Sequence, residues 1–130
     1  MEAENSKLKK LELKNSKIVT GFRFSGAHKL NLSYESKCCR LHGHCWKVEV
    51  EVEGRILEDG MVMDFSRIKD LKKELDHRYI NELIEQPTAE NIALWIGERV
   101  MEAAGDREIR RIVVRVWESE DSYVEMTFEK

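Results

Sequence analysis

Hydrophobic and polar residues alternate along several segments of the chain, and this alternation predicts β-strands. The clearest segment alternates four apolar residues with Lys or Glu: Trp46, Val48, Val50 and Val52. A period of two, with one apolar and one charged face, is typical of an antiparallel sheet that has one face in water. Residues 18–24, 112–116 and 124–128 show a similar alternation. We therefore expect four strands, in two pairs.

Between the two strand pairs, the apolar period changes to that of α-helices. The first helix has four apolar residues at helical spacing: Phe65, Ile68, Leu71 and Leu75. Asp64 or Ser66 is available as its N-cap. The second helix follows Pro87, with Thr88 as its N-cap and Gly105 at its end. Its apolar face is formed by Ile92, Trp95, Ile96 and Val100.

The order of these elements, ββααββ, predicts an α+β fold with both helices on one face of an antiparallel sheet. With 130 residues, the chain is long enough for one compact domain. We expect that domain at residues 17–130, after a charged N-terminal extension at residues 1–16. Residues 26–41 carry no clear period, and so long a loop in a small domain is usually functional.

Composition excludes several classes of partner. The formal net charge is only −3, which gives no electrostatic reason to expect nucleic acid or an anionic membrane as partner. No apolar run approaches the roughly 18–20 residues of a membrane span, and the polar N-terminus predicts no secretory signal. Cys38, Cys39 and Cys45 are an odd set, poorly placed for disulfides. We therefore expect a cytoplasmic protein with reduced thiols, in which Cys45 packs within its strand.

Three of the four histidines are placed to bind one metal ion. His42 and His44 flank Gly43 at the start of a strand, and residues i and i+2 of a strand share one face. His28 follows the first strand, next to this pair if the two strands form a hairpin. Three neutral imidazoles with an open fourth position are typical of catalytic zinc. Two alternatives remain: surface histidines without metal, or a structural zinc with Cys38 or Cys39 as its fourth ligand.

Other candidate chemical groups surround this site in the sequence. A thiol near zinc and cations has a lowered pKa and can act as a base, which describes both Cys38 and Cys39. Asp76 precedes His77, a pair suited to proton transfer, although a histidine at a helix end is equally explained by the helix dipole. Glu118 ends a strand, where a carboxylate could bind a guanidine-like N–C–N edge by two hydrogen bonds.

Taken together, five segments resemble the 6-pyruvoyl-tetrahydropterin synthase family in order and spacing: residues 22–28, 38–44, 60–65, 75–81 and 87–93. The resemblance implies the tunnelling fold, in which ββααββ subunits assemble into trimers or hexamers with the active site between subunits. It also implies zinc on His28, His42 and His44, and 7,8-dihydroneopterin triphosphate as substrate.

The resemblance implies roles for six further residues: proton abstraction by Cys38, proton relay by Asp76 and His77, and pterin binding by Glu118, Thr88 and Glu90. Surface cations that could hold the triphosphate are Lys29, Lys37 and Arg40. The spacing Cys-x3-His-Gly-His resembles that of the 6-carboxy-tetrahydropterin synthases of the queuosine pathway. These release triphosphate and acetaldehyde from the substrate. The animal pyruvoyl-forming enzymes place the cysteine two residues further upstream.

The sequence departs from the family pattern at three positions. Cys39 stands where glycine is usual, Arg78 where a second histidine is frequent, and Ser119 where threonine is common. A branch that makes 6-hydroxymethyl-dihydropterin has Glu in place of the thiol, and position 38 is not Glu. The alternatives to the 6-carboxy product are therefore 6-pyruvoyl-tetrahydropterin, formed by triphosphate elimination only, and a non-catalytic, zinc-stabilised pterin-binding module.

Overall fold

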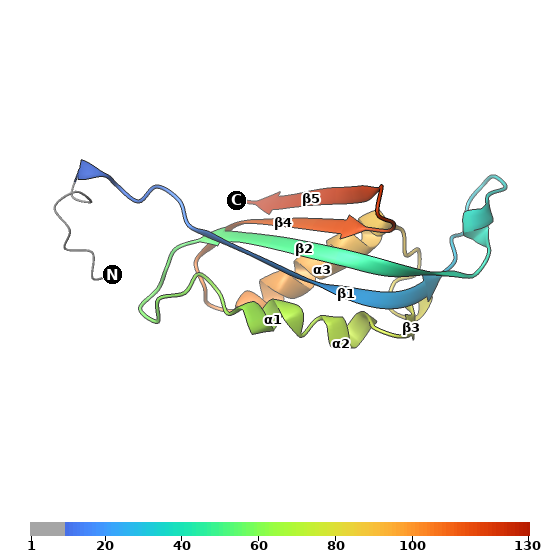
Figure 1. The fold of residues 1–130 in the computed structure, drawn as a ribbon, viewed down its shortest axis with the longest axis horizontal. Helices are drawn as coiled ribbons and strands as arrows, with labels where there is room; N and C mark the ends of the chain where they lie inside the picture. Colours follow the sequence, from blue (N-terminus) through green and yellow to red (C-terminus); the bar gives the residue numbers. More distant parts are fainter. Residues whose placement is uncertain (1–9) are drawn as a thin grey trace.

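The computed structural model describes residues 10–130 and shows a five-stranded sheet with its helices on one face (Figure 1). The strand order is β3-β1-β2-β4-β5. The strands are β1 (Lys17–His28), β2 (His42–Gly54), β3 (Arg78–Tyr79), β4 (Ile109–Trp117) and β5 (Tyr123–Glu129). The helices are α1 (Phe65–Lys69), α2 (Lys72–Leu75) and α3 (Ala89–Ala104), with 3-10 turns η2 (Lys37–Cys39) and η3 (Ile80–Glu82). The predicted α+β class is confirmed.

Strands β1 and β2 form a long antiparallel hairpin that carries the candidate site at one end. Phe24 pairs with Trp46, and His28 pairs with His42 at the last step of the ladder. Strand β1 is therefore longer than the alternation predicted, because the ladder continues through residues 26–28, which we had assigned to the loop. The connecting loop covers residues 29–41 and includes η2.

The sheet is mixed, which corrects the prediction of a purely antiparallel sheet. The two residues of β3 pair with β1 in parallel, next to Gly26 and Ala27. The single helix predicted at residues 65–75 is also wrong, since α1 and α2 are separate. Between them the backbone changes to i→i−3 hydrogen bonds, from Leu71 to Ile68 and from Glu74 to Leu71. Phe65 is 50% exposed, so it does not belong to the buried face.

Helix α3 covers the sheet as predicted. The Thr88 hydroxyl accepts a hydrogen bond from the Asn91 amide, and Gly105 ends the helix with a positive φ of 57°. Gly97 allows close packing, because a Cβ there would lie 2.3 Å from the Phe128 ring. Apolar residues of β2, β4 and α3 form one buried core. Within residues 10–130, no helix has both the length and the apolar character needed to cross a membrane.

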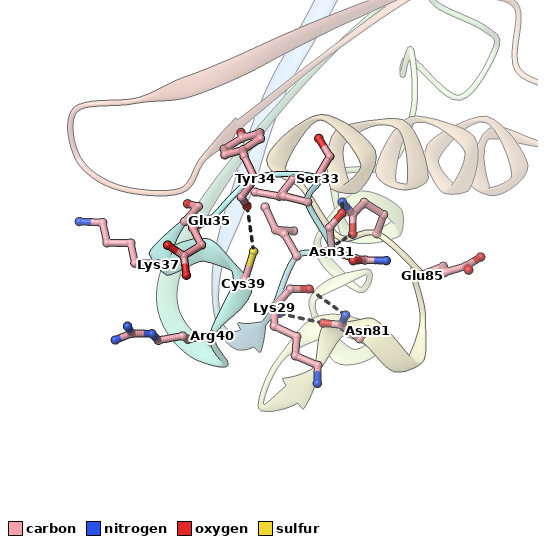
Figure 2. A pocket seen from close by; sticks show the side chains of 14 residues that line it. Lys29, Asn31, Ser33, Tyr34, Glu35, Lys37, Cys39, Arg40, Asn81 and Glu85 are labelled. Carbon is pink, nitrogen blue, oxygen red and sulfur yellow. Dashed lines mark hydrogen bonds between the residues drawn. The ribbon is translucent and has the colours of Figure 1, made fainter.

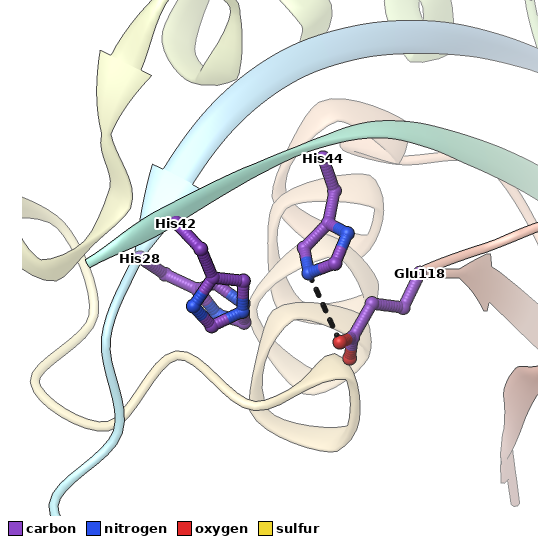
Figure 3. A group of neighbouring side chains, drawn as sticks. All are labelled: His28, His42, His44 and Glu118. Carbon is purple, nitrogen blue, oxygen red and sulfur yellow. Dashed lines mark hydrogen bonds and ion pairs between the residues drawn. The ribbon is translucent and has the colours of Figure 1, made fainter. Parts of the chain in front are cut away.

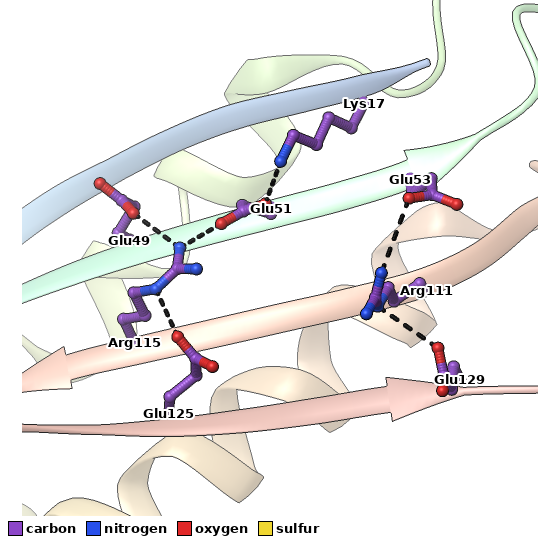
Figure 4. Close-up of polar contacts among 8 residues, drawn as sticks. All are labelled: Lys17, Glu49, Glu51, Glu53, Arg111, Arg115, Glu125 and Glu129. Atoms are coloured by element: carbon purple, nitrogen blue, oxygen red, sulfur yellow. Dashed lines mark hydrogen bonds and ion pairs between the residues drawn. The ribbon is translucent and has the colours of Figure 1, made fainter. Parts of the chain in front are cut away.

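The opposite face of the sheet carries paired charges (Figure 4). The Arg115 guanidinium donates to Glu49 at 2.8 Å, to Glu125 at 2.7 Å and to Glu51. Lys17 donates to Glu51 at 2.8 Å. A second group on this face consists of Glu53, Arg111 and Glu129. The alternating Glu residues of β2 are thus matched by cations from the neighbouring strands.

Cys45 lies on this charged side of β2 and is exposed. The expectation that it packs within the strand is therefore wrong in the single chain. Its position follows from strand alternation, since Cys45 has the same parity as Lys47, whereas the buried Trp46 faces the helices. The N-terminal extension predicted for residues 1–16 stays a prediction, and residues 1–9 of it lie outside the described residues.

Candidate metal centre

Three imidazoles meet at the end of the β1–β2 hairpin (Figure 3). His28 is the last residue of β1, and His42 and His44 belong to the start of β2. Together with Glu118, which follows β4, each offers one ligand atom, and these four atoms lie within 4.8 Å of one another. Strand register explains the convergence, because His28 pairs with His42 and His44 projects from the same face two residues later.

Two backbone carbonyls fix the tautomers of His28 and His42. Nδ1 of His28 lies 2.7 Å from the carbonyl oxygen of Pro87, and Nδ1 of His42 lies 2.6 Å from that of Arg40. A carbonyl oxygen can only accept, so each Nδ1 carries the proton and donates it. In the neutral rings, each Nε2 then has a lone pair. A metal-binding histidine usually has this second hydrogen bond, which orients the ring.

The two Nε2 atoms of His28 and His42 face each other at 3.0 Å. Two unprotonated nitrogens cannot hydrogen-bond to each other, so this approach is favourable only if a cation lies between them and the third ring. Burial, the largest effect, lowers the pKa of His28 and also that of His44. Protonation of these rings is therefore disfavoured, so a bound proton is not the cation that joins them. Neutral imidazoles are the form that binds a metal ion.

The third ring, His44, points a free nitrogen into the same space. Its Nε2 is buried and has no hydrogen-bond partner among the described residues. The Oε1 atom of Glu118 is only 3.1 Å away, but it makes no hydrogen bond with this nitrogen. An unpartnered buried nitrogen is unfavourable in the absence of a ligand. The donor set of three imidazoles and a carboxylate therefore fits a metal ion, and zinc commonly has such ligands.

Glu118 is the member of this group whose place the sequence did not predict. We expected it to bind the substrate, and the structure places it among the candidate metal ligands. The reason is the β2–β4 register, in which Lys47 pairs with Trp117. One step further, Glu118 faces the same side as Trp46 and His44. The alternation of Val116, Trp117 and Glu118 predicts from sequence which face of the sheet Glu118 occupies. Which residues of β2 lie beside it depends on the β2–β4 register, which only the structure shows.

The cysteines lie outside this group, within the described residues. This disfavours a structural zinc closed by Cys38 or Cys39. Both are half-buried on η2, where the Cys38 amide donates to the Ser36 hydroxyl at 3.1 Å. The Cys39 thiol lies 3.9 Å from the Tyr34 carbonyl oxygen and points into the 29–41 loop (Figure 2).

Asp76 and His77 are tied to β1 and are not among the candidate metal ligands. Asp76 Oδ1 accepts from the Ser25 amide at 2.9 Å, and the His77 amide donates to the Ser25 carbonyl at 2.7 Å. His77 adopts a left-handed φ of 59°, which is unusual for a residue other than glycine. Its side chain is 76% exposed, with Nδ1 3.2 Å from Asp76 Oδ1. Together with His44 and Cys45, His77 lines a cavity of about 560 Å³.

The remaining predicted site residues are spread around the 29–41 loop and the start of α3. Thr88 is half-buried and caps α3, while Glu90 is exposed in its first turn. Lys29, Lys37 and Arg40 line a larger cavity of about 940 Å³ inside the loop, but all three are exposed. In Figure 2 the charged ends of Lys37 and Arg40 point away from the loop interior.

The fold and the gathered imidazoles define an α+β protein with a candidate metal site. The model of the 6-pyruvoyl tetrahydropterin synthase family matches residues 17–129. The chain belongs to this family of enzymes. Among solved structures, Plasmodium falciparum 6-pyruvoyl tetrahydropterin synthase has a TM-score of 0.72 at 19% identity, with 89% of this chain and 99% of the other covered. The Caenorhabditis elegans enzyme has a TM-score of 0.70 at 21% identity. At such identities these two structures show the fold alone.

Relatives with closer sequences carry two different names. A Pyrococcus horikoshii protein provisionally named 6-carboxy-5,6,7,8-tetrahydropterin synthase is 41% identical, covering 86% of this chain and 90% of the relative. A Synechocystis 6-carboxy-5,6,7,8-tetrahydropterin synthase is 44% identical over 66% of this chain and 75% of its own length. The dihydroneopterin monophosphate aldolase of Pyrococcus furiosus is 39% identical, with 85% of this chain and 96% of the relative covered.

Proposed function

We propose that this enzyme converts 7,8-dihydroneopterin triphosphate and one water molecule to 6-carboxy-5,6,7,8-tetrahydropterin, triphosphate and acetaldehyde. The observation that carries the proposal is the convergence of three imidazoles on one point. The names of two relatives support the choice of reaction. Such an enzyme would feed the queuosine pathway, and its three unpaired cysteines suit the cytoplasm.

In this proposal, His28, His42 and His44 hold a zinc ion, whose role when bound is to polarise the side-chain oxygens of the substrate and so acidify the adjacent C–H. Glu118 binds the N–C–N edge of the pterin through its carboxylate. Its carboxylate lies 3.1 Å from His44 Nε2, at the same end of the hairpin as the imidazoles, and this supports a place for Glu118 in the substrate site. Thr88 and Glu90, at the start of α3, are proposed to assist.

Cys38 is the proposed base that takes the proton from the substrate carbon. The orientation of Cys39 supports this choice, since its thiol points to the Tyr34 carbonyl inside the loop. Replacing Cys38 with Ala should lower turnover by roughly 10²- to 10⁴-fold, the usual contribution of a positioned base, while zinc remains bound. The matched control is Cys39→Ala, which should keep most of its activity; the reverse result would make Cys39 the base.

Asp76 and His77 are proposed to return a proton during the reaction, in a site completed by a second subunit. Neither residue is among the candidate metal ligands of its own chain, and the His77 side chain is 76% exposed, which leaves it accessible to a second subunit. A mixing experiment tests it. Cys38→Ala and His77→Ala should each have little activity alone. If one active site uses Cys38 from one subunit and His77 from another, mixed oligomers should regain part of the activity. No recovery after verified subunit exchange would contradict the shared site.

The reaction itself is tested by incubating the zinc-loaded protein with 7,8-dihydroneopterin triphosphate and identifying the products by mass spectrometry. We expect 6-carboxytetrahydropterin, acetaldehyde and triphosphate in equal amounts. Formation of 6-pyruvoyl-tetrahydropterin without acetaldehyde would mean that the reaction stops after triphosphate elimination. Binding of the pterin without any product would indicate a non-catalytic module.

A second candidate function is aldol cleavage of dihydroneopterin monophosphate. The Pyrococcus furiosus dihydroneopterin monophosphate aldolase favours this function, because 96% of that relative's length matches this chain. The same assay with the monophosphate separates the two functions. Fast cleavage of the monophosphate, with the triphosphate unreacted, would replace the first proposal by the second.

A further inference from the structure

Two side-chain amides hold the loop that carries the proposed base. The Asn81 side chain accepts from the Lys29 amide at 3.1 Å and donates to the Lys29 carbonyl at 2.9 Å. The Gln86 side chain forms the same pair with Asn31, at 3.0 Å and 2.9 Å. Figure 2 shows Asn81 next to the backbone of Lys29. Residues 29 and 31 thus turn the same edge of an extended backbone toward Asn81 and Gln86.

Residue 30, between them, connects this edge to the proposed base. The Leu30 amide donates to the Cys38 carbonyl at 2.8 Å. The Cys38 amide is in turn held by the Ser36 hydroxyl. The backbone of Cys38 is therefore linked, through one residue of extended chain, to Asn81 and Gln86. A pair of hydrogen bonds from one planar amide fixes both distance and orientation, which a single bond does not.

The segment that contains Asn81 and Gln86 also orients an imidazole. Its Pro87 carbonyl accepts from His28 Nδ1. The Gln86 carbonyl accepts from the Asn91 side chain of α3 at 2.8 Å, and Ile80 is fully buried in the core. Residues 80–87 thus form one anchored segment, with His28 attached on one side and the Cys38 loop on the other.

We infer that Asn81 and Gln86 are positioning residues, which hold the Cys38 thiol at a fixed distance from the His28, His42 and His44 group. This inference rests on the proposed function, in which Cys38 is the base. Neither amide touches the imidazoles, so the two residues act through the loop backbone. The chemistry requires such a clamp, because misplacing a reacting group by about 1 Å can lower a rate by about 10²-fold.

The first test measures turnover of Asn81→Ala and Gln86→Ala. We expect kcat to fall by about 10- to 100-fold, KM to change less than about threefold, and zinc affinity to stay at the wild-type value. Asn81→Asp, which keeps the acceptor and loses the donor, should lie between. The control is Glu82→Ala, an exposed neighbour on the same segment, which should behave as wild type. A raised KM with unchanged kcat would overturn the inference.

Two further measurements do not depend on turnover. Hydrogen exchange of the Lys29 and Asn31 amides should be faster in both alanine variants. The pH profile of iodoacetamide alkylation should shift at Cys38 and not at Cys45, with the sites distinguished by tandem mass spectrometry. Faster exchange with an unchanged alkylation profile of Cys38 would mean that Asn81 and Gln86 only stabilise the loop. That result would overturn the inference. If the wild-type protein turns over neither pterin substrate, the proposed function fails. The exchange and alkylation results then still show whether Asn81 and Gln86 position Cys38.

Discussion

The two polar clusters of this sheet are built in opposite ways. On the charged face, Arg115 donates to three glutamates, and Glu51 also accepts from Lys17, so the charges are matched within the chain. At the hairpin end, three imidazoles direct nitrogens at one another, and one of these, His44 Nε2, has no hydrogen-bond partner among residues 10–130.

The difference distinguishes a cluster that stabilises the fold from one that binds a ligand. Matched charges lower the free energy of the folded chain without any further component. Buried groups that lack partners raise it and persist only where something outside the chain satisfies them. We therefore expect substitutions in the first cluster to alter stability and substitutions in the second to alter metal binding.

The largest expected effect is the loss of metal affinity when one imidazole is removed. His28→Ala, His42→Ala and His44→Ala should each weaken zinc binding by roughly 100- to 1,000-fold, as one of about four ligands is lost. Competition with a chromophoric chelator measures the affinity. His77→Ala is the matched control, because His77 lies outside the group, and it should bind zinc like the wild type. Equal loss in all four variants would contradict the assignment.

The next effect concerns stability. Arg115→Met leaves Glu49, Glu51 and Glu125 facing one another and should lower the free energy of unfolding by about 1–2 kcal/mol. This cost is smaller than that of breaking a fully buried ion pair, because the Arg115 side chain is 22% exposed. Urea denaturation measures this change. Arg55→Met, which breaks a more exposed pair with Glu108, should cost less than about 0.5 kcal/mol. Zinc affinity should be unchanged in both, and a loss in Arg115→Met would show that the clusters are coupled.

Glu118 should contribute less to metal binding than the imidazoles. Glu118→Gln keeps the shape and removes the charge, and we expect zinc affinity to fall by about 10-fold, the lower end of the range for a partner of a metal ligand. Pterin binding to the zinc-loaded variant should be weakened more strongly. Unchanged pterin binding would remove Glu118 from the proposed substrate site and leave it as a metal ligand.

The smallest effect separates the clusters by pH. In metal-free protein, the pKa values of His28 and His44 are lower in the folded state than in the unfolded chain. Below about pH 6.5 the unfolded chain therefore binds more protons than the folded protein. The free energy of unfolding then falls as the pH drops, by at most about 1.4 kcal/mol per pH unit for each ring. The pKa of Glu51 is lowered by Lys17 and Arg115, so its contribution is present above about pH 4.5 and is lost as the pH falls through its lowered pKa.

Thermal unfolding between pH 7.5 and 3.5 should therefore show two separate losses of stability. The upper one should disappear in a His28→Asn, His44→Asn double variant, and the lower one should shrink in Glu51→Gln. A stability that stays flat between pH 7 and pH 5.5 would mean that the buried rings are not neutral in the folded protein.

The sequence was sufficient wherever local periodicity decides the structure. Alternation predicted the hairpin and therefore the approach of His28 to His42, and the caps Thr88 and Gly105 were found from residue type. Alternation also placed Cys45 on the face of Lys47, so the wrong expectation for that residue came from neglecting its parity.

The sequence was insufficient where contacts depend on distant segments. Strand β3 has two residues, too few for any periodic pattern. The place of Glu118 depends on the register between β2 and β4, and the bonds of Asn81 and Gln86 depend on the path of an irregular loop. The roles of Cys38, Asp76 and His77 remain predictions, since geometry alone does not report proton transfer.

The central claim, that three imidazole nitrogens bind one metal ion at the hairpin end, is tested most directly by X-ray absorption of the zinc-loaded protein. We expect one zinc per chain, with three imidazole nitrogens at about 2.0–2.1 Å and an oxygen donor completing the shell. A sulfur at about 2.3 Å, or a spectrum without imidazole scattering, would contradict it.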